Sequence, residues 1–500
     1  MHLLHSGRRS AFRARAATTL LVRAALTAAV LASPIAAAAQ SAPAPAPSAR
    51  AATDPAPTVG NQRATLEKII QRRVLANGLE VIVVENHGVP IATVEIDVRN
   101  GSFTQTPGYE GLAHLYEHMF FNANLDSPSQ EEFQAKLSSI GAIFNGTTNE
   151  EQVNYYLTVP NDRTEEGIAL LAQALRAPLF LEDELTRERE VVIGEYDRAE
   201  SNPFWQLTTA MGKKLWGDQW SRKNTIGDRA TILATTPAKM RAIQQRYYVP
   251  NNTALIVTGD VDPERIFALA QKHYGDWKRR PDPFADAPIP PIPPLARNAA
   301  VIVEQPVAGV IVLMQWHGPS VGADPGATYA ADVFSDILNR DGSAFQRHLV
   351  DSGLWQAVGV NYYTLNHTGP ITISGRTTPE RFDEAMAALE REIAKVVEPG
   401  YFTAEELAAA KQQRAVGTAM GLERASGFAH TIGFWWSVSS LEYYMGYVDN
   451  MAAQTPDDLR DYARRYIIGK PHVTGVLLSS ETRRAMGLTE ADLLGERVTP

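Results

Sequence analysis

The sequence contains no cysteine among its 500 residues. This absence excludes disulfide bonds, a zinc site built from thiolates, and a lipid-modified cysteine at the end of a leader peptide. A bound metal ion must therefore be held by histidine and carboxylate side chains.

A net positive charge is also absent. The chain has 47 basic and 56 acidic residues, a formal net charge of −9. Residues 1–39 contain five arginines and no acidic residue, so the chain without them has 42 basic against 56 acidic residues, a net charge of −14. This balance argues against nucleic acid as a partner. It is compatible with basic or neutral peptide substrates, although a negative surface also serves solubility alone.

The amino terminus has the pattern of a secretory signal peptide. Residues 8–23 contain five arginines and lead into an apolar run over 24–35 that ends in small residues. We expect cleavage after Ala39 and a periplasmic or secreted location, with no stable membrane anchor afterwards. The pair at 8 and 9 invites a twin-arginine interpretation, but Phe12 stands one position too far away, which favours Sec export. An uncleaved anchor is the alternative, and the run is short for a bilayer span.

Two proline-rich segments divide the rest of the chain. Residues 40–61 and 279–296 have linker composition, which leaves predicted domains at 62–278 and 297–500. Both halves open with apolar strands, pass through long helical segments and close on a strand. Strands grouped with covering helices predict an α+β fold, with an α/β sandwich in each half. The shared order of segments indicates a divergent internal duplication.

The most specific pattern is His114-Leu115-Tyr116-Glu117-His118, an H-x-x-E-H sequence of the inverted zincin type. On a helix, His114 and His118 project from one face, one turn apart, and can grip one Zn²⁺. Glu117 lies beside them, where a general base can reach a zinc-bound water without ligating the metal. For the motif taken alone, the alternative is that the two helix histidines are merely packed or solvated side chains.

A third ligand can be sought in the charged run at 185–198. Glu188 and Glu195 are seven positions apart, which puts them on one face of a helix. One of them can bind zinc while the other supports it.

With these residues, the chain resembles the pitrilysin, insulysin and mitochondrial processing peptidase family. The segments that carry the resemblance include 77–79, 100–102, 111–114, 141–148, 155–156 and 251–261. Glu195 follows His118 by 77 positions, which is similar to the family's spacing for its distal zinc ligand.

The resemblance implies a zinc endopeptidase. His114, His118 and Glu195 would hold Zn²⁺, Glu117 would be the catalytic base, and Glu188 would be a second catalytic acidic residue that orients a ligand or water. It also implies two homologous α/β-sandwich domains, each an antiparallel-rich sheet with helices on one face, that form half of a clam-shell chamber. Short or unfolded polypeptides are then the expected substrates.

Asn145 is a candidate substrate-binding residue. If 141–148 is an edge strand beside the metal, an extended peptide can pair with it, and Asn145 can hydrogen-bond the substrate near the cleaved bond. The alternative is a turn asparagine before Gly146. The aromatic stretch 434–445 is predicted to pack in a core, with a chamber wall or an interface as the alternative.

The second half contains no H-x-x-E-H, and it departs from the family in one further respect. Many relatives carry an Arg and a Tyr that help to bind substrate and polarise the scissile carbonyl, whereas Val350 and Gln356 stand at the corresponding positions here. We therefore expect a dimer, either with a related zinc-less chain that supplies the Arg and Tyr or with a second copy.

Two other function classes stay open, a non-catalytic structural or assembly subunit and a periplasmic zinc-binding protein. Further histidines show no ligand spacing among themselves and are predicted to be structural or exposed. These are His87, His317, His348, His367, His430 and His472.

Overall fold

The computed structural model describes residues 62–496. The predicted signal peptide (1–39) and the first predicted linker (40–61) therefore lie outside the described residues. Within the described part, no helix is both long enough and apolar enough to cross a lipid bilayer.

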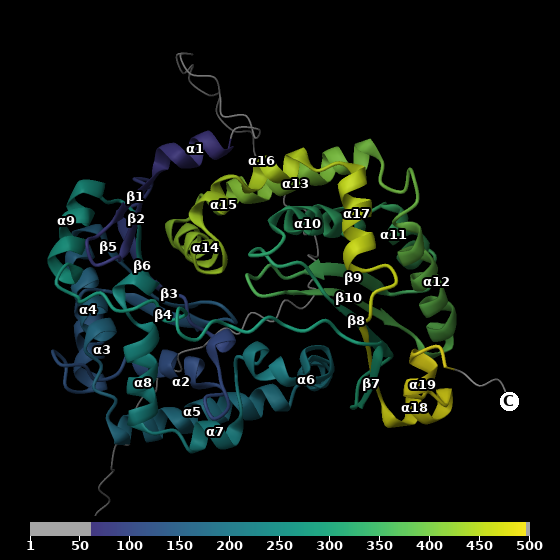
Figure 1. Cartoon of the computed structure of the whole chain (residues 1–500), viewed down its shortest axis with the longest axis horizontal. Helices are drawn as coiled ribbons and strands as arrows, with labels where there is room; N and C mark the ends of the chain where they lie inside the picture. Colours follow the sequence, from purple (N-terminus) through teal and green to yellow (C-terminus); the bar gives the residue numbers. More distant parts are fainter. Residues whose placement is uncertain (1–61, 497–500) are drawn as a thin grey trace, which may run out of the picture. The chain divides into compact units, whose positions relative to one another are not determined.

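A six-stranded sheet forms the centre of the first half (Figure 1). Its strands are β1 (Ile70–Val74), β2 (Glu80–Glu85), β3 (Ile91–Val98), β4 (Ile143–Thr148), β5 (Val153–Pro160) and β6 (Thr253–Gly259). They stand in the order β1-β2-β6-β3-β5-β4. Only β2 and β6 pair in parallel among these strands, and β4 lies at one edge.

A five-stranded sheet forms the centre of the second half. Its strands are β7 (Ala299–Glu304), β8 (Val310–His317), β9 (Ala357–Tyr362), β10 (Pro370–Thr377) and β11 (Val473–Leu478). Their order is β7-β11-β8-β10-β9, with β7 and β11 parallel and the other neighbours antiparallel.

The two sheets share one topology once β1 is set aside. In each, the first strand pairs in parallel with the last, the second strand lies on the other side of the last, and the third strand is at the edge. The α+β fold class is confirmed. The repeated strand order supports the predicted duplication, while the domain limits and the clam-shell chamber stay predictions.

Helices connect the strands in both halves. In the first half they are α1 (Gln62–Ile69), α2 (Leu112–Phe120), α3 (Gln130–Ser139), α4 (Thr164–Arg176), α5 (Glu182–Glu200), α6 (Pro203–Trp216), α7 (Arg229–Leu233), α8 (Pro237–Tyr247) and α9 (Pro263–Tyr274). In the second half they are α10 (Pro325–Asn339), α11 (Ala344–Gln346), α12 (Phe382–Lys395), α13 (Ala404–Gly421), α14 (Ala425–Val438), α15 (Leu441–Met445), α16 (Tyr447–Ala453), α17 (Pro456–Tyr466), α18 (Ser480–Met486) and α19 (Glu490–Leu493).

The sequence marks several of these helix starts. The helices α9, α10 and α17 begin at a proline, whose missing N–H costs nothing at that position. The residue before each proline is Asp262, Asp324 or Thr455, and its side chain accepts a hydrogen bond from the backbone N–H three residues on. These caps satisfy one of the unpaired donors of the first turn.

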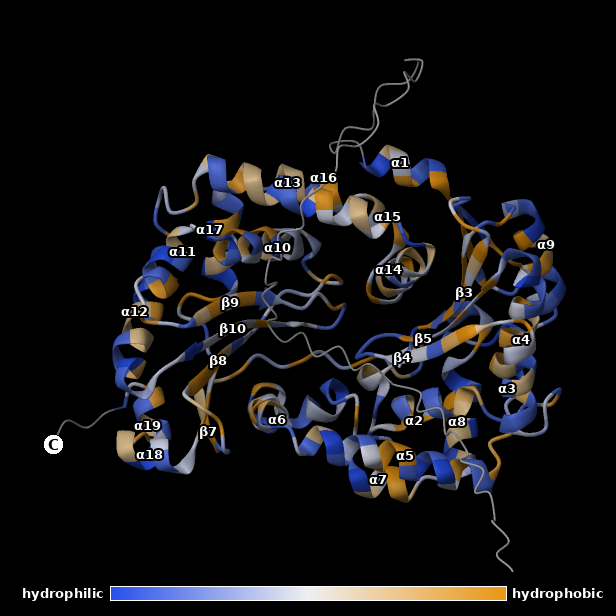
Figure 2. Cartoon of the chain, turned by 180° about the vertical axis from the view of Figure 1, so that it is seen from behind, coloured by the Kyte–Doolittle hydropathy of each residue, from blue (hydrophilic) through white to orange (hydrophobic). Residues whose placement is uncertain are grey.

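Apolar residues gather in the sheets, whereas many helices show one polar and one apolar side (Figure 2). In β3, Val94 and Ile96 belong to the main core of the first half. Glu95 and Asp97 alternate with them on the opposite face and are fully buried too. Other elements of the chain must therefore pack on both faces of this sheet.

Each half contributes a helix to the sheet of the other half (Figure 1). The helix α14 packs on β3 and β6, and α6 packs on β7 and β11. Ile432 and Trp436 of α14 join Ile82 and Ile256 in one apolar cluster. The corresponding cluster under α6 includes Leu207, Met211, Leu313 and Leu477. Trp436, Tyr443 and Tyr444 of the predicted aromatic stretch are buried, which confirms core packing for these three residues, while Phe434 and Trp435 are half-buried.

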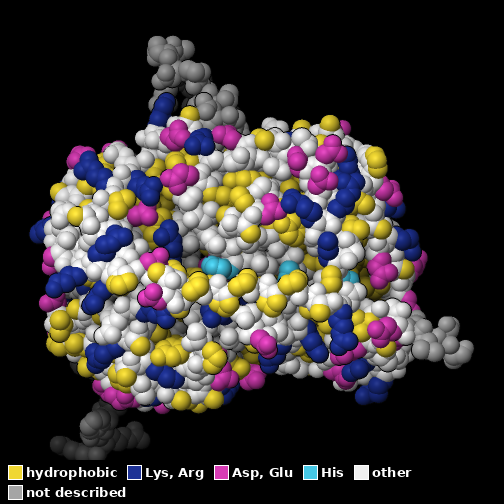
Figure 3. Space-filling view, viewed as in Figure 1, with side chains coloured by type: hydrophobic (Ala, Val, Ile, Leu, Met, Phe, Trp, Pro, Cys, Tyr) yellow, Lys and Arg dark blue, Asp and Glu magenta, His cyan; other side chains and the backbone are white. Residues whose placement is uncertain are grey.

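The charges on the face shown in Figure 3 are mixed. Lys and Arg side chains alternate there with Asp and Glu side chains instead of gathering into one area of a single sign. This face therefore has no extended basic area of the kind that binds nucleic acid.

The packing of α6 predicts a stability defect. Leu207 is fully buried against the second sheet, so Leu207→Ala removes apolar contacts and leaves a cavity. We expect a loss of about 2–5 kcal/mol in the free energy of unfolding. The measurement is the urea midpoint, with Lys213→Ala on the exposed face of the same helix as the control. Equal midpoints for the two variants would contradict the assigned packing.

Candidate metal centre

The helix α2 starts at a glycine for a steric reason. Gly111 has φ 83°, and a Cβ there would lie 2.7 Å from the Ile226 carbonyl oxygen. The apolar positions Leu112, Leu115 and Met119 of α2 are buried in the core of the first half. The same periodicity leaves the partly exposed residues 114, 117 and 118 on the other side of the helix.

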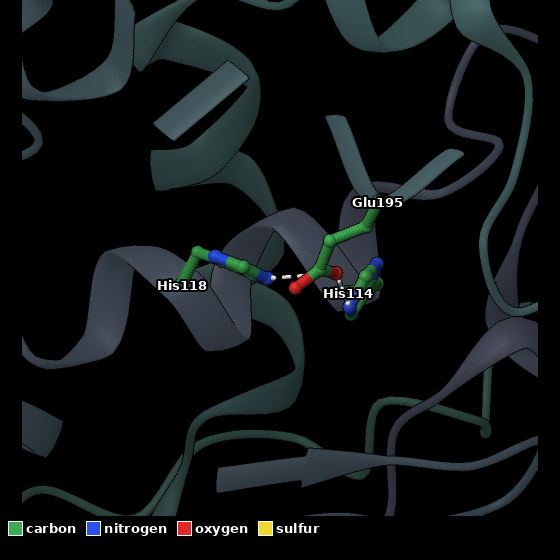
Figure 4. Close-up of side chains that lie close together, drawn as sticks. All are labelled: His114, His118 and Glu195. Carbon is green, nitrogen blue, oxygen red and sulfur yellow. Dashed lines mark ion pairs between the residues drawn. The ribbon is translucent and has the colours of Figure 1, made fainter. Parts of the chain in front are cut away.

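Glu195 of α5 meets the two histidines of α2 (Figure 4). Its carboxylate oxygen Oε2 lies 3.4 Å from His114 Nε2 and 3.6 Å from His118 Nε2. Ligand atoms of the three residues all lie within 4.8 Å of one another. Within residues 62–496, this is the one group of histidine and acidic side chains with such geometry.

This arrangement fits a zinc ion. Zinc bonds of about 2.0–2.2 Å in a tetrahedral site put neighbouring ligand atoms about 3.3–3.6 Å apart, and the two distances from Glu195 agree with that spacing. The side chains are 10–16% exposed, so the site is shielded without being closed. The donor set is two imidazoles and one carboxylate, which leaves a fourth position for water or substrate.

The three groups have different proton affinities. Burial and the nearby His118 lower the pKa of His114 to about 4. Burial opposes charge on His118, but its hydrogen bonds to Glu188 and Glu195 outweigh this and raise its pKa to about 10. Burial by itself raises the pKa of Glu195, but the hydrogen bond to His118 and the charges of the two histidines outweigh this effect, so that the pKa is lowered. The ring nitrogen of His118 and the carboxylate of Glu195 thus favour a positive charge between them, and a bound metal cation would supply one.

Glu188 contacts His118 from the other side. Its Oε2 lies 3.3 Å from His118 Nδ1, the ring nitrogen that faces away from Glu195. The other oxygen accepts hydrogen bonds from Asn122 Nδ2 at 3.3 Å and Gln130 Nε2 at 3.2 Å. An acceptor at Nδ1 fixes the orientation of a ligating imidazole. Asn122 and Gln130 were missed from sequence, because only the tertiary fold brings them to Glu188.

Glu117 lies next to β4 and outside the group of three. Its Oε2 accepts a hydrogen bond from Thr148 Oγ1 at 2.6 Å. A Cβ at Gly146 would lie 2.7 Å from Glu117 Cγ, so the strand approaches the side chain closely only because residue 146 is glycine. Burial raises the pKa of Glu117, and the Thr148 bond works against that rise.

Asn145 lies in the middle of β4, so the alternative of a turn asparagine is wrong. It is exposed and pairs in register with Tyr156 of β5. Its predicted contact with substrate stays a prediction.

Four of the remaining histidines bond to carboxylates. The pairs are His87 with Asp260, His348 with Glu392, His367 with Glu151, and His430 with Glu95. The sequence did not indicate these pairs, since the partners are 44 to 335 positions apart.

The chain matches two family models. Residues 80–226 match the model described as Insulinase (Peptidase family M16), and residues 234–414 match the model described as Peptidase M16 inactive domain. An insulin-degrading enzyme homolog of Dictyostelium discoideum is 29% identical over 230 residues, which are 46% of this chain and 23% of that protein. The chain therefore spans less than a quarter of that relative's length.

Other similar proteins match over more of their length. An uncharacterized zinc protease of Rickettsia felis is 23% identical over 72% of this chain and 85% of its own. The crystal structure of the first half of the periplasmic protease PqqL from Escherichia coli has a TM-score of 0.72 and 19% identity, covering 86% of this chain and 96% of that one. Against PqqL as a whole, the match covers 50% of that chain. At this identity, the structural match shows the fold.

The zinc affinities of three Glu→Gln variants in α5 should differ in a defined order. Loss of a residue that only supports a metal ligand typically weakens metal binding by roughly tenfold to hundredfold. Glu195→Gln removes a ligand itself and should weaken zinc binding by more than this. Glu188→Gln should fall within that range, and Glu190→Gln, on an exposed position, should leave binding unchanged. Competition with a chromophoric chelator measures all three. A larger loss for Glu188→Gln than for Glu195→Gln would reverse the assignment.

Proposed function

The chain belongs to peptidase family M16, and from this premise we propose that it is a zinc-dependent endopeptidase acting on short or unfolded polypeptides. One observation carries the proposal, namely the convergence of His114, His118 and Glu195 on one point. Glu117 precedes His118 on the same helix, α2. Similar proteins named zinc proteases support the proposal. The four residues of this group all lie in 80–226, the part that matches the Insulinase model, and not in 234–414, the part that matches the inactive-domain model, so the chemistry is assigned to the first half.

In the proposed mechanism, His114, His118 and Glu195 would hold the zinc ion, which when bound would polarise the peptide carbonyl and lower the pKa of water. Glu117 accepts the proton of the attacking water and then passes it to the departing amine. The Thr148 hydroxyl holds one oxygen of Glu117, so the carboxylate keeps a single orientation. Glu188 keeps His118 aligned through Nδ1.

The edge strand β4 would hold the substrate. An extended peptide can add to a sheet edge through main-chain hydrogen bonds. Such a peptide would lie along β4, whose residue Gly146 borders Glu117. Asn145 would then hydrogen-bond the substrate close to the cleaved bond.

We further propose a second chain and an exported location. This chain matches the first half of PqqL, which is about half of the full PqqL chain. A chamber as large as a four-domain protein can form would therefore need a second chain of similar size. A related zinc-less chain is the preferred partner, and a second copy is the other option. The composition of residues 1–39 supports export, and the relative PqqL is described as periplasmic. The limits 62–278 and 297–500 are retained as proposed domains.

Glu117→Gln should separate chemistry from metal binding. The amide keeps the shape of the side chain but cannot take a proton, so turnover of peptides about ten to thirty residues long should fall by at least about 10²-fold. Zinc content should stay that of the wild type, whereas His118→Ala should lose both zinc and turnover. A fully active Glu117→Gln enzyme would refute the role of the base.

The active species should be larger than one chain. Light scattering of the mature protein, alone and with any co-purifying chain, should give a mass of about two chains for the fraction that cleaves peptides. A strictly monomeric enzyme with full activity would contradict the proposed dimer.

A further inference from the structure

A row of polar side chains crosses three strands on the face of the first sheet that α14 covers. Glu95 of β3 pairs in register with Tyr156 of β5, and Tyr156 pairs in register with Asn145 of β4. Because registered neighbours point to the same face, the three side chains form one line across the sheet. The line runs from the buried centre of the sheet to its exposed edge strand.

A histidine of the second half completes this row. His430 of α14 approaches with Nδ1 at 2.5 Å from Glu95 Oε2, and the other oxygen of Glu95 accepts a hydrogen bond from Asn154 at 2.6 Å. The His430 ring centroid lies 4.3 Å from that of Tyr156. Glu95 is fully buried, and the His430 side chain is 36% exposed.

The contact with Glu95 determines which atom of His430 can meet a ligand. An ionised carboxylate only accepts hydrogen bonds, so Nδ1 must carry a proton and Nε2 is the remaining ring nitrogen. Burial lowers the pKa of His430, but the hydrogen bond to Glu95 outweighs it, so that the pKa is raised. The favoured imidazolium presents Nε2–H as a donor.

The surroundings of the pair are not negatively charged overall. Arg99 continues the same face beyond β3, with its guanidinium 3.8 Å above the Trp436 ring and donating to the Trp436 carbonyl oxygen. Burial, followed by the charge of Glu95, raises the pKa of Asp97 and favours its neutral form. The Arg99 guanidinium thus places a cationic group on the same face as the His430–Glu95 pair, which favours an anionic ligand there.

The row ends beside the proposed base. Asn145 is the last member of the row, and the next residue of β4, Gly146, lies against Glu117. A peptide that pairs with β4 would place alternate side chains toward the face that carries His430.

We propose that His430, together with Tyr156 and Asn145, forms a subsite that selects an acidic side chain of the substrate. The inference rests on the proposed peptidase function and deepens it, because the second half of the chain would then contribute a specificity residue to a site whose chemistry lies in the first half. Nε2–H of His430 would donate to a carboxylate oxygen of an Asp or Glu close to the scissile bond.

The test compares peptides that differ only by Glu or Gln at each position around the cleaved bond. The zinc-loaded wild type should prefer Glu at one position by about tenfold in kcat/KM, mainly through KM, as expected for a charge-assisted hydrogen bond. His430→Asn should lose this preference, since the Asn amide can keep the Glu95 contact but has no group at the place of Nε2. His430→Gln, which returns a donor near that place, should restore part of it.

The matched control is His348→Asn. His348 also bonds through Nδ1 to a buried glutamate, Glu392, at 2.9 Å, but it lies in the π-helical segment Arg347–Asp351 against α12 of the second half. This variant should keep the preference for Glu. Melting temperatures of all variants identify any that fail to fold.

The outcomes separate the two proposals. If the wild type cleaves peptides but shows no preference for Glu, or if His430→Asn keeps that preference, the acidic subsite is wrong while the peptidase function stands. If the wild type cleaves none, the peptidase function fails. The subsite is then decided by fluorescence anisotropy of labelled Glu and Gln peptides on the zinc-loaded protein, where equal affinities overturn it and a His430-dependent preference for Glu supports it.

Discussion

The contact between α2 and α5 is the constraint on which the proposed centre depends. It brings Glu195 to within 3.4 Å of His114 and 3.6 Å of His118, although the sequence separates the two helices by about sixty residues. Glu184 secures this contact, since its carboxylate accepts backbone hydrogen bonds from Ala123 and Gln130, which follow α2 in the chain. Buried Leu185 and Val192 of α5 join the same core. Burial of three ionisable groups is unfavourable unless they are compensated, and a divalent cation at their centre would provide that compensation.

The duplicated fold explains why only one half carries such a centre. The helix α10 follows β8 as α2 follows β3, and α13 precedes α14 as α5 precedes α6. In the second half, Arg414 of α13 donates two hydrogen bonds to Asp336 of α10, at 2.7 and 2.8 Å. The positively charged Arg414 side chain therefore connects α10 and α13. In the first half, the corresponding helices α2 and α5 are connected by the possible metal ligands His114, His118 and Glu195. The exchange of α6 and α14 between the sheets ties the two halves together, and it carries His430 to the first sheet.

The sequence predicted those features that depend on local spacing. His114 and His118 share a helix face at any i and i+4 separation, and alternating apolar residues marked β2, β3, β7 and β8. The assignment of Glu195 over Glu188 needed the family resemblance, because both residues lie on one face of α5. Features that depend on strand register or on packing between halves gave no local signal, as in the contact of Gly146 with Glu117, the bonds from Asn122 and Gln130 to Glu188, and the His430–Glu95 pair. Asn145 could not be assigned to strand or turn until its register with Tyr156 was known.

The most direct test of the account is an anomalous difference map at the zinc absorption edge from crystals of the zinc-loaded protein. The account predicts one strong peak at about 2.0–2.2 Å from nitrogen atoms of His114 and His118 and from an oxygen of Glu195. Glu117 and Glu188 should lie outside bonding distance. A peak coordinated by Glu188 in place of Glu195, or no peak between α2 and α5, would contradict it.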